Sequence, residues 1–179
     1  MLDTQVNKKT EMTIEIAQKE DAQALADIFL GHIAAHTEYI SHGEMQMGVG
    51  QGVIIDGELK AVPAHDAREK WMKYILYHIE EESVAEVWKA VDEGRIVGFV
   101  VADIEADGDA PFGMICDILV KEDCRQHGTG AQLLQTAIDW LHGRGIKDIY
   151  LESGKNNHPA HRYFEKKGFA KVSEIYKLA

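Results

Sequence analysis

The segment Asp123-Cys124-Arg125-Gln126-His127-Gly128-Thr129-Gly130-Ala131 decides the fold of this chain. It follows an apolar run from Met114 to Val120, which predicts a buried strand, and it leads into residues 132–141, whose apolar positions have helical spacing. At the start of a helix, unpaired backbone N–H groups and the helix dipole attract an anion. The two glycines let the backbone approach that anion closely. The segment therefore predicts a phosphate-binding loop.

The spacing of this loop excludes two common nucleotide-binding motifs. A dinucleotide-binding fingerprint would need a third glycine at the position of Leu133, and a P-loop would need Gly-Lys-Ser or Gly-Lys-Thr at the end of the run. The order Arg-x-x-Gly-x-Gly at residues 125–130 instead resembles the pyrophosphate loop of the GNAT superfamily of acyl-CoA-dependent N-acetyltransferases. On these six residues alone, an ordinary strand-to-helix turn is an open alternative.

A second motif, in the C-terminal third, strengthens the resemblance. Residues 157–169 follow the pattern Asn-x-x-Ala-x-x-aromatic-aromatic-Glu-Lys-x-Gly-Phe, which is similar to the second signature of the same superfamily. Asn157 is expected to cap a helix here, Pro159 suits its first turn, and Gly168 ends it. The close resemblance covers residues 115–169, and the chain before it matches only in its order of elements.

The resemblance implies a three-layer α/β fold in which helices flank a mixed central sheet. That sheet is mostly antiparallel and includes one parallel βαβ unit. In the family it opens beside its fourth strand, where the pantetheine arm of coenzyme A inserts, and a backbone N–H of Leu119 or Val120 is implied to hold the thioester oxygen. Carried over to this sequence, the acetyl-CoA-binding residues are Ile118, Leu119, Val120, Arg125, Gln126, His127, Gly128, Thr129, Gly130, Ala131 and Asn157.

The attacking amine must lose a proton, so a general base is expected. Asp117 and Glu152 interrupt apolar runs, where a carboxylate is costly without a reason, and Glu86 is a third candidate. Each could instead be a solvent-facing strand residue. Family members often place a general-acid tyrosine directly before Glu-Lys-x-Gly-Phe, but Phe164 stands there and the tyrosine is Tyr163. Because helix neighbours point about 100° apart, Tyr163 cannot simply substitute for it: either Tyr163 is core packing or the general acid comes from elsewhere. Tyr163 stays a catalytic candidate beside Asp117 and Glu152.

Size and composition predict one domain with an acidic surface. A chain of 179 residues supports one core, so residues 13–179 are expected to form a single domain after a mobile arm, residues 1–12. The net charge of −11 disfavours nucleic acid and favours a small cationic amine as substrate. No run of about 18 apolar residues predicts a membrane span. Two cysteines without Cys-x-x-Cys spacing, and no leader, favour the cytoplasm.

The other elements follow from periodicity and turn signals. Helices are expected after Asp21 and at residues 64–82, and Asp56-Gly57 marks a hairpin within the Gly-rich residues 41–63. Further strands are expected at residues 13–17, 83–91, 95–105, 148–153 and 171–178. The last of them offers an edge through which two copies could pair as a homodimer.

Nine histidines raise the question of a metal site. His32 and His36 are four residues apart, and His158 and His161 are three apart, but no Glu or Cys completes a tight ligand set near either pair, so no metal is expected. The sequence thus favours direct transfer of an acetyl group from acetyl-CoA to the primary amine of a small cationic molecule in a ternary complex. A non-catalytic acyl-CoA-binding sensor on the same fold is the alternative, which Phe164 keeps open.

Overall fold

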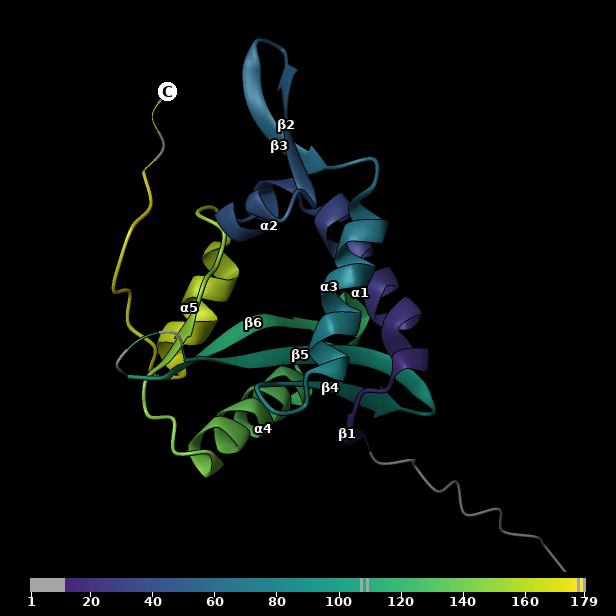
Figure 1. Ribbon diagram of the computed structural model, residues 1–179. Helices are drawn as coiled ribbons and strands as arrows, with labels where there is room; N and C mark the ends of the chain where they lie inside the picture. Colours follow the sequence, from purple (N-terminus) through teal and green to yellow (C-terminus); the bar gives the residue numbers. More distant parts are fainter. Residues whose placement is uncertain (1–11, 107, 109, 177, 179) are drawn as a thin grey trace, which may run out of the picture.

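A five-stranded mixed sheet forms the centre of the computed structural model, which describes residues 12–106, 108, 110–176 and 178 (Figure 1). Its strands are β1 (Thr13–Ile16), β4 (Ala85–Asp92), β5 (Arg95–Glu105), β6 (Phe112–Val120) and β7 (Ile149–Leu151), and they lie side by side in the order β1-β4-β5-β6-β7. The first three pairs are antiparallel, and β7 runs parallel to β6. The predicted α/β class with a mixed sheet is confirmed.

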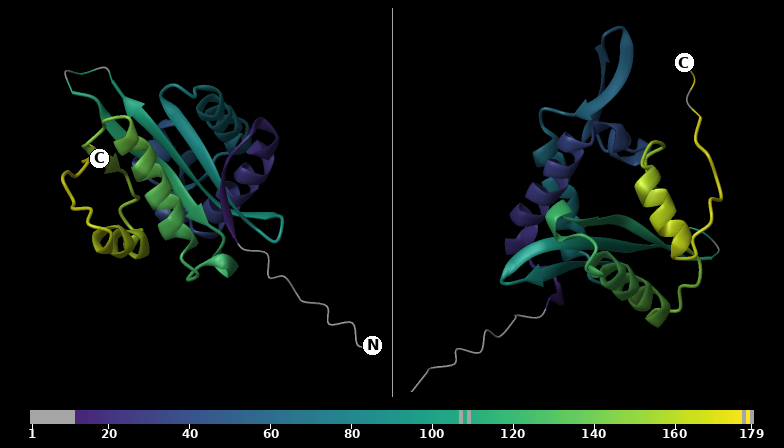
Figure 2. Two further views of the ribbon diagram at one scale, coloured as in Figure 1. Left: turned by 90° about the horizontal axis from the view of Figure 1, so that it is seen from below. Right: turned by 180° about the vertical axis from the view of Figure 1, so that it is seen from behind.

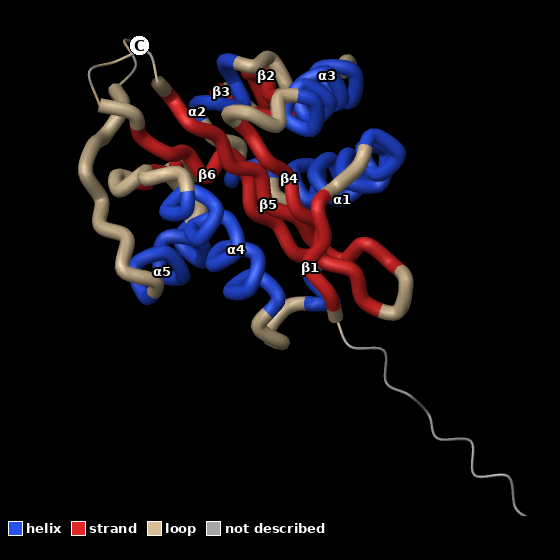
Figure 3. Tube along the Cα trace, turned by 60° about the horizontal axis from the view of Figure 1, so that its bottom comes forward, coloured by secondary structure: helices blue, strands red, loops and turns tan. Residues whose placement is uncertain are grey.

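Helices cover both faces of this sheet and make three layers (Figure 3). On one face, α1 (Ala22–Ala35) and α3 (Ala67–Glu80) pack together, and Trp71 stacks on Phe29 with ring centroids 4.8 Å apart. On the other face lie α4 (Thr129–Gly143) and α5 (His158–Lys166). The apolar positions of α4 that the sequence spacing indicates, Leu133, Leu134, Ala137 and Leu141, are buried against the sheet.

A two-stranded hairpin projects away from the sheet, as Figures 1 and 2 show. It consists of β2 (Gly50–Ile55) and β3 (Glu58–Pro63), and both turn residues have positive φ, 53° at Asp56 and 80° at Gly57. These angles are those of a type I′ turn, as the Asp-Gly pair predicts. A short helix, α2 (His42–Gln46), precedes the hairpin and was not predicted from the sequence.

The C-terminal strand predicted at residues 171–178 is wrong for the residues that the structure describes there, which form neither strand nor helix. The side chains of Val172, Ile175 and Tyr176 are exposed. An alternating apolar pattern forms a stable strand only when a sheet edge pairs with it, and β7 offers an edge of only three residues. The strand predicted at residues 148–153 is likewise shorter, since β7 spans only Ile149–Leu151.

Two further predictions concern the ends of the domain and the membrane. The expected N-terminal arm, residues 1–12, lies outside the described residues except for Met12, which packs against the core on the α4 side. Among the helices that the structure describes, none has the length and the apolar character needed to cross a bilayer.

Candidate active site

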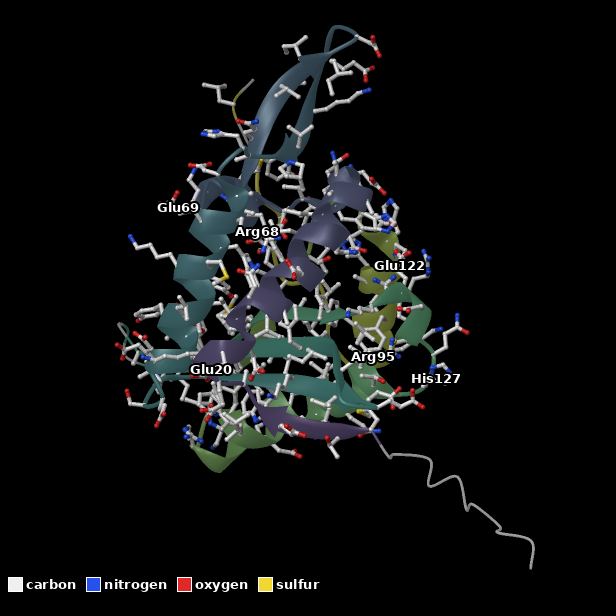
Figure 4. All side chains as sticks on the ribbon, turned by 90° about the vertical axis from the view of Figure 1, so that its right-hand side faces the viewer. Glu20, Arg68, Glu69, Arg95, Glu122 and His127 are labelled. Atoms are coloured by element: carbon white, nitrogen blue, oxygen red, sulfur yellow. The ribbon has the colours of Figure 1, made fainter. Side chains whose placement is uncertain are left out.

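The predicted phosphate loop joins β6 to α4 through a 3-10 turn, η3 (Glu122–Cys124). Gln126 and Gly128 both have left-handed backbone conformations, with φ of 70° and 85°, and Gly128 is the N-cap of α4. The first N–H groups of α4 therefore face the loop without helical partners. Arg125 fastens the loop to the strand, because its Nε donates to the carbonyl of Val120 at 2.9 Å. His127 is exposed on the outside of the loop (Figure 4).

The edge of β6 that faces β7 is open along its C-terminal half. Among the described residues β7 pairs with residues 113–115 alone, and no strand pairs with that side of β6 from Cys116 onward. The Lys121 N–H donates to Val97 of β5, and backbone groups alternate along a strand. Ile118 and Val120 therefore direct their backbone groups toward the open edge, whereas those of Leu119 face β5. Of the two residues proposed for the thioester oxygen, only Val120 faces the gap.

Asp117 lies on the face of β6 that packs against α3, where it joins a chain of polar groups. The Tyr74 hydroxyl donates to Asp117 Oδ2 at 2.7 Å, and His78, one turn along α3, lies 3.4 Å from Asp103 of β5. Removal from water raises the pKa of Asp117 to about 7, although the Tyr74 hydrogen bond opposes this rise. Burial, followed by the charge of Asp117, raises the pKa of Tyr74 well above 10. Tyr74 therefore stays a donor while Asp117 titrates near neutrality.

Two further carboxylates extend from Asp117, because the charge of Glu44 acts on Asp117 and the charge of Glu152 acts on Glu44. Glu44 of α2 accepts from the backbone N–H of Ser41, and Glu152, directly after β7, accepts from the backbone N–H of Gly43 at 3.0 Å. Burial and then the charge of Glu152 raise the pKa of Glu44, and the charge of Glu44 in turn raises that of Asp117. We call Asp117, Glu44 and Glu152 the carboxylate cluster.

Backbone contact fixes the two segments that carry Glu44 and Glu152. Gly154, in the loop between β7 and α5, is buried against the 3-10 turn η2 (Thr37–Tyr39), and a Cβ on it would lie 2.1 Å from the Tyr39 carbonyl oxygen. Only glycine permits this approach. The loop after β7 is thereby held beside α2.

Tyr163 projects toward the start of α4. Its buried hydroxyl has no hydrogen-bond partner within the described part of the chain and lies 3.7 Å from the Cβ position of Gly130, which is also 3.7 Å from a Val120 methyl. Phe164 instead packs its ring edge-on against Phe169 with centroids 5.9 Å apart. Helix α5 thus directs the Tyr163 hydroxyl, and not the Phe164 ring, toward the place where the phosphate loop meets the open edge of β6.

Two of the predicted site residues lie differently from the expectation. Glu152 does not belong to a strand, because β7 ends at Leu151. Its side chain accepts a hydrogen bond from the backbone N–H of Gly43. Glu86 of β4 alternates with Val87, whose side chain packs in the α1–α3 core, so Glu86 points to the other face, where burial raises its pKa and Arg144, at the end of α4, opposes that rise. Glu86 is therefore separated from the carboxylate cluster. Asn157 caps α5 as predicted, accepting from the Ala160 N–H at 3.3 Å.

The prediction that nothing completes a ligand set near the histidine pairs is wrong for His32 and His36. Glu122, which is 86 residues away from His36 in the sequence, places a carboxylate oxygen 2.6 Å from His36 Nε2. Donor atoms of His32, His36 and Glu122 all lie within 4.8 Å of one another. Folding brings α1 and η3 together here, and no local spacing in the sequence indicates this.

Sequence reasoning missed Tyr74, His78 and Glu44 as functional candidates. Tyr74 carried a signal only for packing, since it shares the apolar face of α3 with Trp71 and Ile75. A tyrosine and a histidine four residues apart could have indicated a polar stripe on that face. Their carboxylate partners come from strands, which no spacing rule connects to the helix.

Known proteins share both the sequence pattern and the fold. The profile of the Acetyltransferase (GNAT) family matches residues 56–169. N-alpha-acetyltransferase 30 of Schizosaccharomyces pombe is 25% identical over 113 residues, which cover 63% of this chain and 75% of that protein. The probable N-acetyltransferase camello of Xenopus tropicalis is 27% identical over 147 residues, 74% of this chain and 67% of that protein. The PaiA N-acetyltransferase of Thermoplasma acidophilum, solved with coenzyme A, superposes with a TM-score of 0.69 at 17% identity and covers 93% of both chains.

A glycine loop and a helix N-terminus beside the open edge of β6 suit an anionic cosubstrate such as coenzyme A. The family match covers well over half of the chain, so the chain belongs to the GNAT family of acetyltransferases. It is an acetyl-CoA-dependent N-acetyltransferase.

Proposed function

We propose that this enzyme acetylates the primary amine of a small cationic molecule, by direct attack on acetyl-CoA in a ternary complex. The observation that carries the proposal is the position of Asp117, on the strand that has the open edge and within reach of the charge of Glu44, which in turn interacts with Glu152. A cluster of negative charge at the end of a thioester channel selects a positively charged acceptor. The chain's net charge of −11 acts in the same direction.

In this proposal, acetyl-CoA lies along the open edge of β6. The backbone N–H groups from Gln126 to Ala131 and the guanidinium of Arg125 hold the diphosphate, with Gly128, Thr129 and Gly130 forming the helix start and His127 at its rim. Ile118 and Val120 offer backbone groups to the pantetheine amides, and one of their N–H groups holds the thioester oxygen as it becomes negative. One such donor is worth about 3–4 kcal/mol in the barrier. Asn157 caps α5 and so fixes the start of the helix that carries Tyr163.

Asp117 is the general base in this scheme. The amine nitrogen attacks the thioester carbonyl carbon, its proton passes to Asp117 Oδ2 directly or through water, and the C–S bond breaks to release the thiolate of coenzyme A. A base with a pKa near 7 suits an enzyme working near neutrality, because it is largely unprotonated and still accepts a proton readily. Glu44 and Glu152 attract the acceptor, and Tyr74 orients the base.

Tyr163 is the proposed proton donor to the departing thiolate. Among the described residues its buried hydroxyl has no hydrogen-bond partner, and it lies 3.7 Å from the Cβ position of Gly130 at the start of α4. Since the pKa of a thiol is about 8.5, the thiolate needs only modest help. Tyr163 is therefore proposed to accelerate the reaction without being indispensable.

The experiment that tests the proposed function is acceptor profiling by release of free coenzyme A thiol. The panel contains polyamines, aminoglycosides, amino acids, a peptide with a free N-terminus and a neutral hydroxylated amine. We expect cationic small amines to be the fastest, and Glu44→Gln to lower kcat/KM for them about tenfold, as expected for loss of about 1.4 kcal/mol of charge interaction.

The matched control is Glu69→Gln, which removes the same charge from the exposed side of α3, away from the cluster (Figure 4). It should leave kcat/KM within about twofold, since a distant exposed charge is screened. Preference for the neutral amine or the peptide would contradict the acceptor class. Binding of acetyl-CoA without any amine-dependent turnover would favour the sensor alternative.

A further inference from the structure

A group of metal-ligand side chains lies outside the proposed chemistry, between the C-terminal end of α1 and the turn η3. His32 and His36 face each other across one turn of α1, with ring centroids 5.0 Å apart. Glu122 approaches them from η3, and Figure 4 shows it between the purple helix and the green segment before α4. All three donor atoms lie within 4.8 Å of one another.

We propose that His32, His36 and Glu122 form a binding site for a zinc-type divalent cation, with three protein ligands and one open position. Two histidines at i, i+4 plus one glutamate are a recurrent ligand set for Zn²⁺. In a tetrahedral site with bonds of about 2.1 Å, donor atoms are about 3.4 Å apart. The 2.6 Å contact between His36 Nε2 and Glu122 Oε1 must lengthen by about 0.8 Å for both atoms to bind one ion, and the Glu122 side chain is exposed.

The surroundings of His36 support this assignment. Its Nε2 meets Glu122 at 2.6 Å, while its Nδ1 lies 3.5 Å from Glu38 Oε1. Metal-binding histidines characteristically pair their second ring nitrogen with a carboxylate, which fixes the ring and strengthens the ligand. Glu38 is therefore positioned to support His36.

The charges around the group admit a cation. Arg125 opposes binding, since its Nη1 lies 3.5 Å from Glu122 Oε1. Two carboxylates, Glu122 and Glu38, offset that single charge at contact distance. The adjoining pocket between α1 and the end of β6 is lined by Asp123 and Lys121, whose charges cancel, and by Asp27, which pairs with Arg68 at 2.7 Å, so it adds no net positive charge.

The site is tested on the full chain, stripped with a chelator and titrated with ZnCl₂ by calorimetry and with CoCl₂ by visible absorption. We expect one equivalent of Zn²⁺ per chain, and Co²⁺ spectra with the intense visible bands of four-coordinate geometry. His36→Asn and Glu122→Gln should each weaken binding at least about tenfold, and Glu38→Gln about tenfold. Zn²⁺ should also raise the Tm of the wild type but not of Glu122→Gln.

The matched control is His158→Asn, which removes a histidine from the second pair, on α5. Its ring lies 5.7 Å from that of His161, and the part of the chain that the structure describes places no carboxylate or thiol with that pair as a ligand group. Binding should be unchanged in this variant. No heat and no Co²⁺ spectrum with wild-type protein would overturn the proposal, and so would equal affinity in the wild type, His36→Asn and Glu122→Gln with circular dichroism confirming folded variants.

Discussion

The two faces of β6 differ in what the same strand presents to its neighbours. Toward α4 it presents Ile115, Ile118 and Val120, which pack against the apolar side chains of that helix. Toward α3 it presents Asp117, hydrogen-bonded to Tyr74 and largely removed from water. Burying an ionisable group costs free energy unless its interactions compensate. The α4 face of β6 is therefore apolar, whereas the α3 face, where Leu119 packs in the core with α1 and α3, also carries a buried carboxylate whose cost the proposed chemistry explains.

Replacing the base should produce the largest effect and tests the α3 face directly. Asp117→Asn keeps the shape and can still accept from Tyr74, but it cannot take a proton at neutral pH. We expect kcat/KM to fall about 100- to 10,000-fold, the range for loss of a general base. Thiol release with the best acceptor measures it. A loss below threefold would remove Asp117 from the chemistry.

Truncating the α4 face should affect stability and leave the chemistry alone. Leu133 is fully buried between α4 and the sheet. Leu133→Ala should lower the free energy of unfolding by about 2–5 kcal/mol through lost burial and a cavity, measured by urea denaturation. The pH dependence of turnover per folded molecule should match that of the wild type. A shifted pH profile would show that the two faces are not separable.

Replacing Tyr163 tests whether a residue on the α4 side of the sheet takes part in the chemistry. Tyr163 packs with the α4 core, but its hydroxyl points toward the start of α4 beside the phosphate loop. Tyr163→Phe should slow turnover at least about tenfold if the phenol protonates the thiolate. Single-turnover rates with acetyl-CoA measure it. An unchanged rate would show that Tyr163 serves only in core packing and is not the general acid.

Removing the partner of Asp117 should have the smallest effect. Tyr74→Phe deletes a hydrogen bond that holds down the pKa of Asp117, so that pKa should rise. At pH 7 less of the base is then ionised, and we expect about a fivefold loss, equivalent to about 1 kcal/mol. The rate should recover at higher pH. A loss of equal size at every pH would mean that Tyr74 acts through structure alone.

Much of the fold could be predicted, because its signals are local. The apolar spacing after Gly130 gives α4, the Asp56-Gly57 pair gives the hairpin turn, and Gly168 ends α5 with a φ of 93°. The C-terminal strand failed because alternation describes a side-chain pattern and a strand also needs a partner edge. The short β7 provides little of one.

The sequence could predict the phosphate-loop side of the candidate site, but only part of the carboxylate cluster. The loop from Arg125 to Ala131 is contiguous, so its residues and their order carry the information. The carboxylate cluster draws on α2, β6 and the residue after β7, and the partners of Asp117 and Asp103 come from α3. Asp117 and Glu152 stood out as carboxylates in apolar runs. Glu44 and Tyr74 do not interrupt an apolar run in this way, so nothing in the local sequence marked them as site residues.

The pH dependence of kcat/KM tests the central claim most directly. Asp117 must be ionised to accept a proton, and its pKa is raised to about 7, so activity should fall as the pH drops through 7. Wild-type enzyme should show this acid limb, and Asp117→Asn should keep only the dependence that belongs to the amine itself. A limb near pH 7 that persists in Asp117→Asn would contradict the account.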